Sequence, residues 1–479
     1  MIAPSADDYD VIVIGSGAAG LAAAVGFLEA CGDTAGRALV VERGKEEEAP
    51  GNSRWTGGYL RMADHRTMAP DFLEDVFAFT AGDLTTGPPP HVPDDKAYFR
   101  RLAADAPGTI EWLESLGVEF EHLPTIFLAQ SGPRLLPAGG GNAVVETLTR
   151  TLRRLGGELV FETTAESLVT AEDGTVTGVR VRGADGRLRT IGAGAVVIAS
   201  GGFQGNPEMM ASYIGPGASQ LATIAPGGAC NRGDGIRMAI DVGAQPSGQW
   251  DMIHAEPTDP RSKQPEAVVM LYPYGLLVNV EGQRFLDEGY DTVQETFEDV
   301  AYRIYREPKG TAWLVADQKM FDIPEYRRAL LTERGPISSD TVEGLARLIE
   351  IDPETLATTV ADYNAACSDG FFDATKLDGL DTNGLAIPKS NWARRLGDGP
   401  YVAWPISCSV VFTFGGIRTD AEARVLSADG YAIPGLYTAG EVSGVYYHKY
   451  PGGTSFLRGL TFGRIAGRNI ATSRTPVGS

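Results

Sequence analysis

The sequence is poor in cysteine, histidine and basic residues. It has 4 cysteines and 5 histidines among 479 residues, and no two cysteines stand at a metal-ligand spacing such as CxxC. A structural metal site is therefore not expected, and a disulfide framework is improbable in so long a chain. Lysine and arginine number 41 against 62 aspartate and glutamate residues, which gives a net charge of −21. That balance disfavours nucleic acids and anionic membrane surfaces as partners.

Long hydrophobic runs are also lacking. The first apolar stretch, VIVIG, is far too short to cross a bilayer, and the N-terminal MIAPSADDYD lacks the basic segment of a signal peptide. We therefore expect a cytoplasmic protein with no membrane span. Hydrophobic residues nonetheless make up 43% of the chain, which is enough for the cores of about two or three domains.

A dinucleotide-binding pattern opens the chain. The stretch YDVIVIGSGAAGLAAAVGFLEA predicts a strand over 9–14, a glycine turn and an alanine-rich helix, and RALVVERG predicts a second strand that ends at Glu42. Gly15 permits the tight turn, Gly17 lets the backbone approach a pyrophosphate, and Gly20 lets helix and strand pack closely. The helix N-terminus stabilises the phosphates, and Glu42 accepts hydrogen bonds from a ribose.

The following segments favour FAD over NAD as the dinucleotide. Small residues in RGKEEEAPGNSRWTGGYLR suit the edge of a flavin ring and its phosphates. A predicted β-meander then leads to a buried strand over 195–199, and the late strand GYAIPGLYTAGEVSG carries an acid, Glu441, suited to the ribityl–pyrophosphate region. The residues predicted to contact FAD are Gly15, Gly17, Ala18, Ala19, Gly20, Glu42, Arg43, Asn52, Ser53, Thr56, Gly57, Gly58, Ala165, Ser200, Gly201, Asp234, Gly440, Glu441, Ser455 and Phe456.

Four stretches, GNSRWTGGYLR, YPYGLLVNVEGQRFLDEG, FTFGGIRTD and YYHKYPGGTSFLRG, resemble the flavoprotein family of fumarate reductases and succinate dehydrogenases. Within it the chain is most similar to tricarballylate dehydrogenases and, more distantly, to 3-ketosteroid Δ1-dehydrogenases. The resemblance implies an α/β fold, in which a Rossmann-type FAD-binding domain (1–250 and 414–479) carries an inserted α+β cap, or substrate, domain (251–413). Succinate dehydrogenases link FAD to a histidine that corresponds to Trp55, so non-covalent FAD is expected.

The resemblance also implies the chemistry, in which one substrate carbon exchanges a hydride with the flavin and its neighbour exchanges a proton with a side chain. Four polar positions of fumarate reductases differ here. The proton-donating arginine corresponds to Thr292 and the carboxylate-binding arginine to Tyr450, while two histidines correspond to Phe412 and Glu256. Dedicated fumarate reduction is therefore not expected.

Tyr450 is the first candidate catalytic residue. In the ketosteroid dehydrogenases a tyrosine at a similar Y-P-G site, helped by a backbone amide, binds a ketone oxygen. A helix N-terminus with exposed glycine amides, including that of Gly453, can stabilise a developing enolate oxygen. The base that removes the neighbouring proton must then come from elsewhere, and the candidates are Tyr272, Tyr274 and Glu256.

Four further residues are candidates for binding substrate. His254 and His448 lie in motif regions and can orient a carboxylate or a ketone. Arg54 and Arg61 resemble positions that face the flavin or substrate in the tricarballylate group, and a planar guanidinium matches a carboxylate. Each of the four has an equally plain alternative, a structural hydrogen bond or a salt bridge.

The leading hypothesis is an FAD-dependent dehydrogenase, or desaturase. It introduces a double bond α,β to the carbonyl of a small ketone, keto acid or carboxylate, a tyrosine removes the proton, and an external acceptor takes the electrons. Three alternatives stay open. They are a tricarballylate-type polycarboxylate dehydrogenase, a flavin-dependent reductase of an activated double bond, and a non-catalytic flavin-binding protein.

Overall fold

The structure, a computed structural model, describes residues 9–32, 34, 36–81, 96–123, 134–397 and 399–473. These residues form two units, which are described in turn. The described parts of 9–254 and of 411–473 make up the first unit, and the described residues of 255–410 form the second. The chain passes from one unit to the other within strands β11 and β15.

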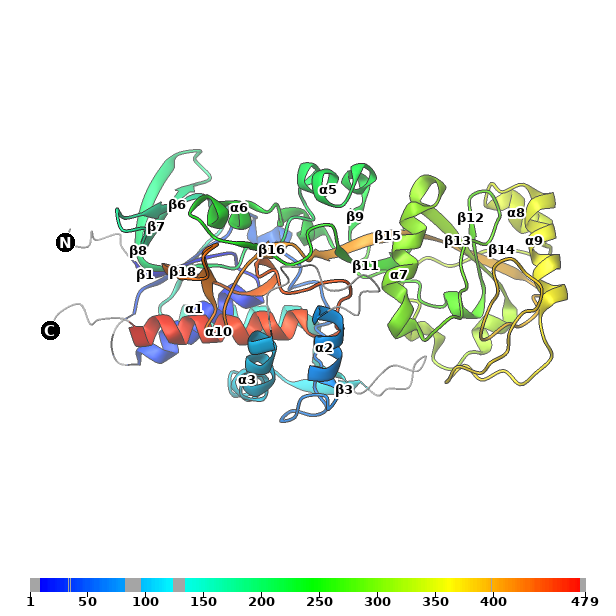
Figure 1. The fold of residues 1–479 in the computed structure, drawn as a ribbon, viewed down its shortest axis with the longest axis horizontal. Coiled ribbons are helices and arrows are strands. Elements are labelled where there is room, and N and C mark those ends of the chain that lie inside the picture. Colours follow the sequence, from blue (N-terminus) through cyan, green and yellow to red (C-terminus); the bar gives the residue numbers. More distant parts are fainter. Residues whose placement is uncertain are drawn as a thin grey trace. The chain divides into compact units, whose positions relative to one another are not determined.

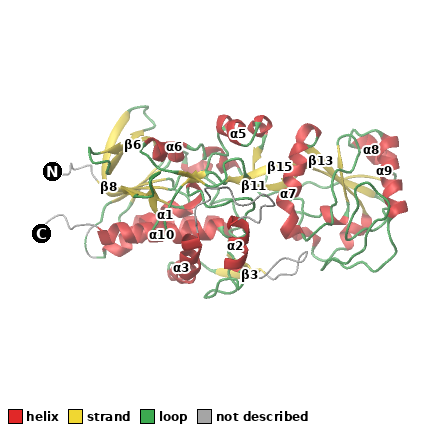
Figure 2. Cartoon of the chain, viewed as in Figure 1, coloured by secondary structure: helices red, strands yellow, loops and turns green. Residues whose placement is uncertain are grey.

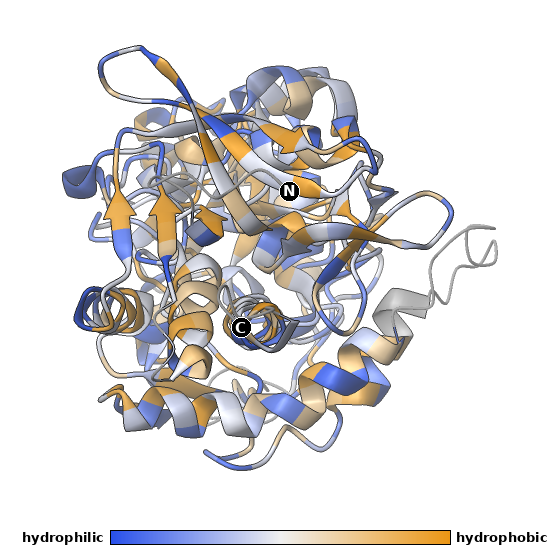
Figure 3. Ribbon diagram, turned by 90° about the vertical axis from the view of Figure 1, so that its left-hand side faces the viewer, coloured by the Kyte–Doolittle hydropathy of each residue, from blue (hydrophilic) through white to orange (hydrophobic). Residues whose placement is uncertain are grey.

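A mainly parallel sheet forms the centre of the first unit. The strand order is β17-β18-β8-β1-β2-β5, and all pairs along it are parallel except β17–β18. Val11, Ile12 and Val13 of β1 are fully buried, as strands covered on both faces are in parallel sheets. Figure 3 shows hydrophobic residues gathered on strands of the sheet. The strands are β1 (Tyr9–Ile14), β2 (Ala38–Val41), β5 (Glu158–Val160), β8 (Leu188–Ile198), β17 (Arg424–Leu426) and β18 (Ala432–Thr438).

Antiparallel strands extend one part of this sheet. β6 (Thr164–Thr170) pairs with β7 (Val176–Arg182), which pairs with β8, as the predicted meander requires. Gly174 and Gly186, the second residues of its two Asp-Gly turns, have φ values of +84° and +74°. The short strands of the first unit outside the sheet are β3 (Phe120–Leu123), β4 (Arg134–Pro137), β9 (Ala222–Thr223), β10 (Pro246–Ser247) and β16 (Gly416–Ile417).

Two long helices of the first unit, α1 (Ala18–Cys31) and α10 (Ser455–Ser473), lie side by side (Figure 1). Their approach requires glycine, because a Cβ on Gly463 or on Gly467 would collide with carbonyl oxygens of α1. The other helices of this unit are α2 (Phe72–Ala81), α3 (Lys96–Ser115), α4 (Gly140–Arg154), α5 (Pro207–Tyr213) and α6 (Asp234–Asp241).

The second unit is an antiparallel sheet with helices (Figure 2). The strand order is β11-β15-β13-β12, and β14 also pairs with β15. The predicted α/β class, with a Rossmann-type sheet and an inserted α+β unit, is therefore confirmed. The elements are β11 (Ile253–Thr258), β12 (Leu276–Asn279), β13 (Thr311–Asp317), β14 (Ile337–Ser339), β15 (Tyr401–Thr413), α7 (Val293–Arg306), α8 (Val342–Leu348) and α9 (Pro353–Ala366). Within the residues that the structure describes, no helix combines the length and apolarity needed to cross a membrane.

Candidate functional site

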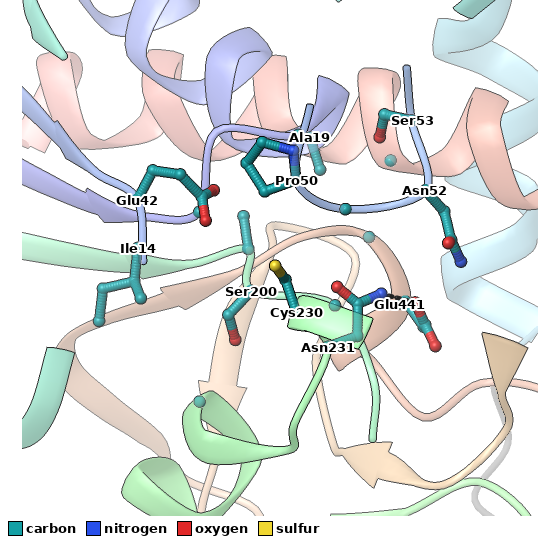
Figure 4. Close-up of a pocket in the computed structure, with 18 of the residues that line it drawn as sticks. Ile14, Ala19, Glu42, Pro50, Asn52, Ser53, Ser200, Cys230, Asn231 and Glu441 are labelled. Carbon is teal, nitrogen blue, oxygen red and sulfur yellow. Dashed lines mark hydrogen bonds between the residues drawn. The ribbon is translucent and has the colours of Figure 1, made fainter. Parts of the chain in front are cut away.

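A pocket in the first unit lies at the carboxyl ends of β1, β2 and β8, where open parallel sheets bind their ligands. Figure 4 shows Glu42 and Glu441 on different sides of it. Gly20, Gly57 and Gly58, predicted to contact FAD, are not part of its lining. The other predicted contacts line it, namely Gly15, Gly17, Ala18, Ala19, Glu42, Arg43, Asn52, Ser53, Thr56, Ala165, Ser200, Gly201, Asp234, Gly440, Glu441, Ser455 and Phe456.

Three glycines shape the turn between β1 and α1. Gly15 has a φ of +109°, which disfavours any side chain, and a Cβ there would collide with the carbonyl oxygen of Ala199. A Cβ on Gly20 would collide with the Gly15 carbonyl, so this glycine is required for close packing of helix and strand. Gly17 precedes α1, and its Cβ would lie 3.1 Å from Ser53 Oγ. The turn therefore leaves room for a ligand at the positive end of α1.

Glu42, at the end of β2, is held in place by the glycine turn. One carboxylate oxygen accepts hydrogen bonds from the N–H and the hydroxyl of Ser16, at 3.0 and 2.9 Å, and the other accepts from the N–H of Gly44 at 2.9 Å. The next residue, Arg43, forms an ion pair with Asp234, the first residue of α6. An acid at the end of the second strand is where a Rossmann-type site binds a ribose.

Two buried oxygen atoms of residues that line the pocket have no hydrogen-bond partner within the described part of the chain. They are Asn52 Oδ1 and Ser200 Oγ. The amide nitrogen of Asn52 donates to the carbonyl oxygen of Val411 at 2.6 Å, which fixes the orientation of the side chain. Buried polar atoms are normally paired, so both atoms are suited to a polar ligand. The glycine turn, the acid at Glu42 and these two atoms together fit a bound dinucleotide.

The two ends of the pocket can be assigned from the same geometry. A ribose at Glu42 and a pyrophosphate at the start of α1 place the adenosine half of FAD at the β2 end. The flavin ring then belongs at the other end, where Phe412 and Phe456 supply aromatic surface and Ser455 begins α10. The N-terminus of a second helix therefore lies at this end of the pocket, where it would favour negative charge on a bound cofactor.

Glu441 lies on this side of the pocket within a network of neutral donors. Its carboxylate accepts from the N–H of Thr413 at 3.0 Å, from Asn231 Nδ2 at 3.2 Å and from Gln204 Nε2 at 3.4 Å. Burial raises the pKa of Glu441, and the N–H of Thr413 acts in the opposite direction. The network fixes the carboxylate beside Gly440, which also lines the pocket.

The phenol of Tyr450 lies at the N-terminus of α10. Its oxygen accepts hydrogen bonds from the N–H groups of Thr454 and Ser455, both at 3.0 Å, and its own O–H donates to Ser455 Oγ at 3.0 Å. The sequence predicted this helix start, with exposed glycine amides, including that of Gly453, directed at a substrate oxygen. In the structure the amides that meet the phenol belong to the two residues that follow Gly453.

Aromatic rings surround Tyr450 on one side. The ring centroid of His254 lies 4.4 Å from that of Tyr450, and those of Phe412 and Tyr446 lie at 5.0 and 5.4 Å. His254 is 4% exposed and also packs on Phe412 at 4.9 Å. Because Phe412 lines the pocket, this cluster joins the phenol to the flavin end.

Two arginines lie near residues 450–453, the segment between Tyr450 and the start of α10 that we call the 450–453 corner. The carbonyl oxygen of Gly453 accepts a hydrogen bond from the backbone N–H of Arg61 at 2.9 Å. The guanidinium of Arg61 is buried and forms ion pairs with Asp71, at 3.1 Å, and with Asp75. A Cβ on Gly453 would lie 3.3 Å from Nε of Arg134, a residue that the sequence did not single out. Burial first, and the charge of Arg61 second, lower the pKa of Arg134 to about 10.

His448 and Arg54 were predicted to bind substrate. His448 has a φ of +59°, and its N–H donates to the side chain of Gln249 at 2.7 Å. Its Nε2 is buried and has no hydrogen-bond partner among the described residues. Arg54 donates to Asn142 at 3.1 Å and is not part of the pocket lining, so its observed contact is structural. His448 therefore keeps the predicted role more readily than Arg54 does.

The three candidate bases lie in the second unit. Tyr272 is fully buried with its hydroxyl 2.6 Å from Thr296 Oγ1, and Tyr274 is 4% exposed and donates to the carbonyl of Ala374 at 2.7 Å. Burial raises the pKa of both phenols. Both tyrosines belong to the core of their unit, which gives them a packing role. Glu256 is half-buried on β11.

Several residues that line the pocket were not predicted from the sequence. Cys230 ends a short glycine-rich helical turn (Pro226–Cys230) and Asn231 follows it, a segment without a recognisable motif. Arg458 lies one turn into α10 within the letters SFLRG, which read as an ordinary surface position of a helix. For Phe412 the sequence does hold a signal, because this residue corresponds to a family histidine near the substrate.

The parallel sheet, the glycine turn and the elongated pocket define a Rossmann-type dinucleotide-binding flavoprotein. Residues 10–457 match the family described as FAD binding domain, and the chain belongs to that family. FAD is accordingly its cofactor. The predicted relation to fumarate reductases and ketosteroid dehydrogenases is confirmed by the similarities that follow.

Three relatives illustrate the range of the family. The chain is 30% identical to a 4-oxocyclohexanecarboxylate 2-dehydrogenase of Sinomonas cyclohexanicum, over 92% of this chain and 82% of the relative. It is 28% identical to a probable fumarate reductase of Shewanella frigidimarina, over 96% and 74% of the two chains. It is 26% identical to a vinyl phenol reductase of Lactiplantibacillus plantarum, over 97% of each.

Solved structures show the same fold. The open conformation of a flavocytochrome c3 fumarate reductase superposes with a TM-score of 0.78 at 25% identity, covering 98% of this chain and 79% of the other. A 3-ketosteroid Δ1-dehydrogenase from Sterolibacterium denitrificans superposes with a TM-score of 0.73 at 22% identity, covering 98% and 100%. The chain is therefore an FAD-dependent oxidoreductase that acts on CH–CH groups or on the corresponding double bonds of small substrates.

Proposed function

We propose that the protein is a dehydrogenase that introduces a carbon–carbon double bond next to the carbonyl of a small keto acid. The observation that carries the proposal is the phenol of Tyr450 at the N-terminus of α10, where two backbone amides donate to its oxygen. Support also comes from the 30% identity to a dehydrogenase of a cyclic keto acid. A tyrosine in place of the family's carboxylate-binding arginine favours a ketone at this point.

The two amide donors determine how the phenol acts. The two amides occupy the acceptor side of the Tyr450 oxygen, so the phenol O–H is left to act as a hydrogen-bond donor. In the structure Ser455 Oγ accepts this hydrogen bond. Rotation of that O–H gives the hydrogen bond to a substrate ketone. Hydrogen bonds in series polarise one another, so the amides strengthen this donor as negative charge develops on the ketone oxygen.

FAD, when bound, supplies the acceptor for the hydride that leaves the β carbon. The protein must remove a proton from the α carbon, which the hydrogen-bonded ketone acidifies. Of the predicted bases, Tyr272 and Tyr274 have their hydroxyls bonded inside the second unit, and Glu256 remains the candidate.

Arg134 supports a substrate that carries a carboxylate as well as a ketone. It is 6% exposed, and the position of a Cβ on Gly453 is 3.3 Å from its side chain. A buried guanidinium near the phenol supplies a positive group beside the 450–453 corner that can pair with an anionic ligand. A neutral cyclic ketone and a tricarboxylate are the two comparison substrates that test this preference.

Anaerobic mixing with substrates tests the proposed reaction. We expect 4-oxocyclohexanecarboxylate to bleach the absorbance of bound FAD faster than cyclohexanone or tricarballylate does. Bleaching by tricarballylate alone would select the polycarboxylate alternative.

A second candidate, reduction of an activated double bond, is favoured by the identity to the fumarate and vinyl phenol reductases. It predicts that prereduced enzyme is reoxidised by an α,β-unsaturated acid while no saturated compound bleaches it.

Replacing Tyr450 with phenylalanine should lower the rate of FAD reduction by substrate at least about tenfold, because it removes the donor to the developing charge. FAD should stay bound, since Tyr450 does not line the FAD pocket. Stopped-flow absorbance gives the rate. The matched control is Tyr447→Phe on the same segment, whose hydroxyl accepts from the N–H of Gly248 at 3.0 Å. Equal rates in the Tyr450→Phe variant and the wild type would contradict the assignment.

A further inference from the structure

Arg458 is a buried cation in the lining of the FAD pocket. It lies one turn into α10, is 1% exposed, and donates from Nη1 to the carbonyl oxygens of Gly440 and Ser443 at 2.7 and 3.1 Å. Its guanidinium carbon lies 4.6 Å from the ring centroid of Tyr446. Its Nε is buried and has no hydrogen-bond partner among the residues that the structure describes. The side chain is therefore anchored by neutral groups.

No carboxylate neutralises this cation within ion-pair distance in the described part of the chain. Burial raises the pKa of Glu441, and the charge of Arg458 acts on this carboxyl in the opposite direction, but the carboxylate takes its hydrogen bonds from neutral donors such as Thr413 and Asn231 and forms no ion pair with Arg458. In the second unit, by contrast, buried Arg284 pairs directly with Glu288. A buried charge without a counter-charge is costly, and a ligand with negative charge nearby would offset the cost.

Bound FAD has two places where negative charge can meet Arg458. One is the pyrophosphate, which carries the same charge in both oxidation states. The other is the isoalloxazine ring, which becomes electron-rich when it accepts a hydride and tends to lose its N1 proton. Arg458 packs on Tyr446, and Tyr446 lies 5.9 Å from Phe412, ring centroid to ring centroid. Since Phe412 belongs to the flavin end of the pocket, this chain of contacts favours the ring.

We propose that Arg458 places a positive charge without an ion-pair partner at the flavin end of the pocket and thereby stabilises reduced FAD over oxidised FAD. Charge near the ring is a recognised means by which a protein tunes the electronics of a flavin. The interaction acts in a buried, low-dielectric setting and adds to the positive end of α10. The inference depends on FAD binding and not on which substrate is used. Its consequence is a cofactor that accepts electrons more readily, as a dehydrogenase requires.

The experiment compares Arg458→Met with Arg458→Lys and with Arg464→Met. The methionine variant keeps the length of the side chain and removes the charge, whereas the lysine variant keeps the charge and loses the guanidinium fork. Arg464 is the matched control. It lies on the same helix, donates to a backbone carbonyl, that of Gly108, at 2.7 Å, packs on Trp112, and is not part of the pocket lining.

The midpoint potential of bound FAD is the first readout. We expect Arg458→Met to weaken binding of reduced FAD about tenfold more than binding of oxidised FAD, which lowers the potential by about 30 mV for a two-electron couple. The dissociation constant for sulfite, which adds to the oxidised ring and makes it anionic, should rise about tenfold. The potential should stay at the wild-type value in Arg458→Lys and in Arg464→Met.

Two outcomes would overturn the proposal. If Arg458 binds the pyrophosphate instead, Arg458→Met weakens the binding of oxidised and of reduced FAD equally, and the midpoint potential stays at the wild-type value. If its role is only to hold the carbonyls of Gly440 and Ser443, the lysine and methionine variants lose thermal stability together and share one potential. Should Arg458→Met retain too little FAD for titration, the sulfite affinity of Arg458→Gln decides the question. An affinity equal to that of the wild type refutes the assignment.

Discussion

Replacing Gly17 with valine should yield a folded, colourless protein. Gly17 has φ −69° and ψ 176°, which any residue can adopt, so the substitution introduces no backbone strain. Its Cβ would lie 3.1 Å from Ser53 Oγ, and the two methyl groups would extend into the space before α1. That space is where the pyrophosphate must approach the backbone. We expect retained FAD to fall at least about a hundredfold, because the phosphates lose both room and the helix N-terminus.

The absorbance of purified protein at flavin wavelengths, relative to protein concentration, measures this effect. Gly17→Ala adds a single carbon at the same position and should give an intermediate loss. Gly335→Val is the control for adding a valine elsewhere, since a Cβ at exposed Gly335 meets no atom within 4 Å. A yellow and fully loaded Gly17→Val protein would refute the location of the pyrophosphate.

The glycine turn shows which parts of the site can be read from sequence. Each glycine has a role that depends on its immediate neighbours, namely the φ of Gly15, the close packing at Gly20 and the open space at Gly17. Local rules also predict the start of α9, where Asp352 accepts the N–H of Thr355 at 2.9 Å and Pro353 is the first helical residue. Such features are short-range, so their chemistry is visible in the letters.

The tyrosines of the second unit show where sequence reasoning ends. The letters LYPYG identify two phenols but do not indicate that both point into the core, because that depends on Thr296 and Ala374, which lie 24 and 100 residues away along the chain. For the same reason, a sequence cannot show whether a cation has an ion-pair partner in the fold. Arg61 is neutralised by two acids, whereas Arg458 is held by carbonyl oxygens, and nothing in their local sequences distinguishes them.

The family resemblance helped where local rules could not. It drew attention to Tyr450, whose phenol lies at the start of α10. It directed glycine amides at a substrate oxygen, and it gave no indication that the amides of Thr454 and Ser455 donate to the phenol itself. Those contacts arise because a helix N-terminus directs the N–H groups of its first turn along its axis, and α10 begins two residues after Gly453.

Replacing Glu288 with alanine should strongly destabilise the second unit. Glu288 is fully buried, and its carboxylate accepts from Arg284 at 2.9 and 2.6 Å and from the N–H of Leu277 at 3.0 Å. Lys389, also fully buried, lies 3.9 Å away and donates to the carbonyl of Gly275. Without the acid, two buried cations face each other unneutralised, and breaking such a pair costs about 3–5 kcal/mol.

Urea unfolding followed by tryptophan fluorescence measures the free energy of unfolding. The matched control is Asp299→Ala, which removes the acid of an exposed i,i+4 pair with Arg303 in the same unit. That loss should cost only about 0–1 kcal/mol. The loss of stability in Glu288→Gln should lie between those of Glu288→Ala and Asp299→Ala, because glutamine keeps an acceptor for the N–H of Leu277 but lacks the charge. Equal effects of Glu288→Ala and Asp299→Ala would show that the buried network contributes nothing special.

The defect in Glu288→Ala should also depend on pH, through Lys389. Burial lowers the pKa of Lys389 to about 8, and the charge of Glu288 opposes that shift, so removing Glu288 lowers the pKa further. As pH rises past the lowered pKa, the folded variant releases the proton while the unfolded chain still holds it, and the free energy of unfolding rises. The free energy of unfolding of the variant begins to rise at a lower pH than that of the wild type. The difference in this free energy between the two proteins therefore shrinks from pH 7 to pH 9. Adding Lys389→Met to Glu288→Ala should remove this pH dependence and leave the part of the defect due to Arg284, which stays charged throughout.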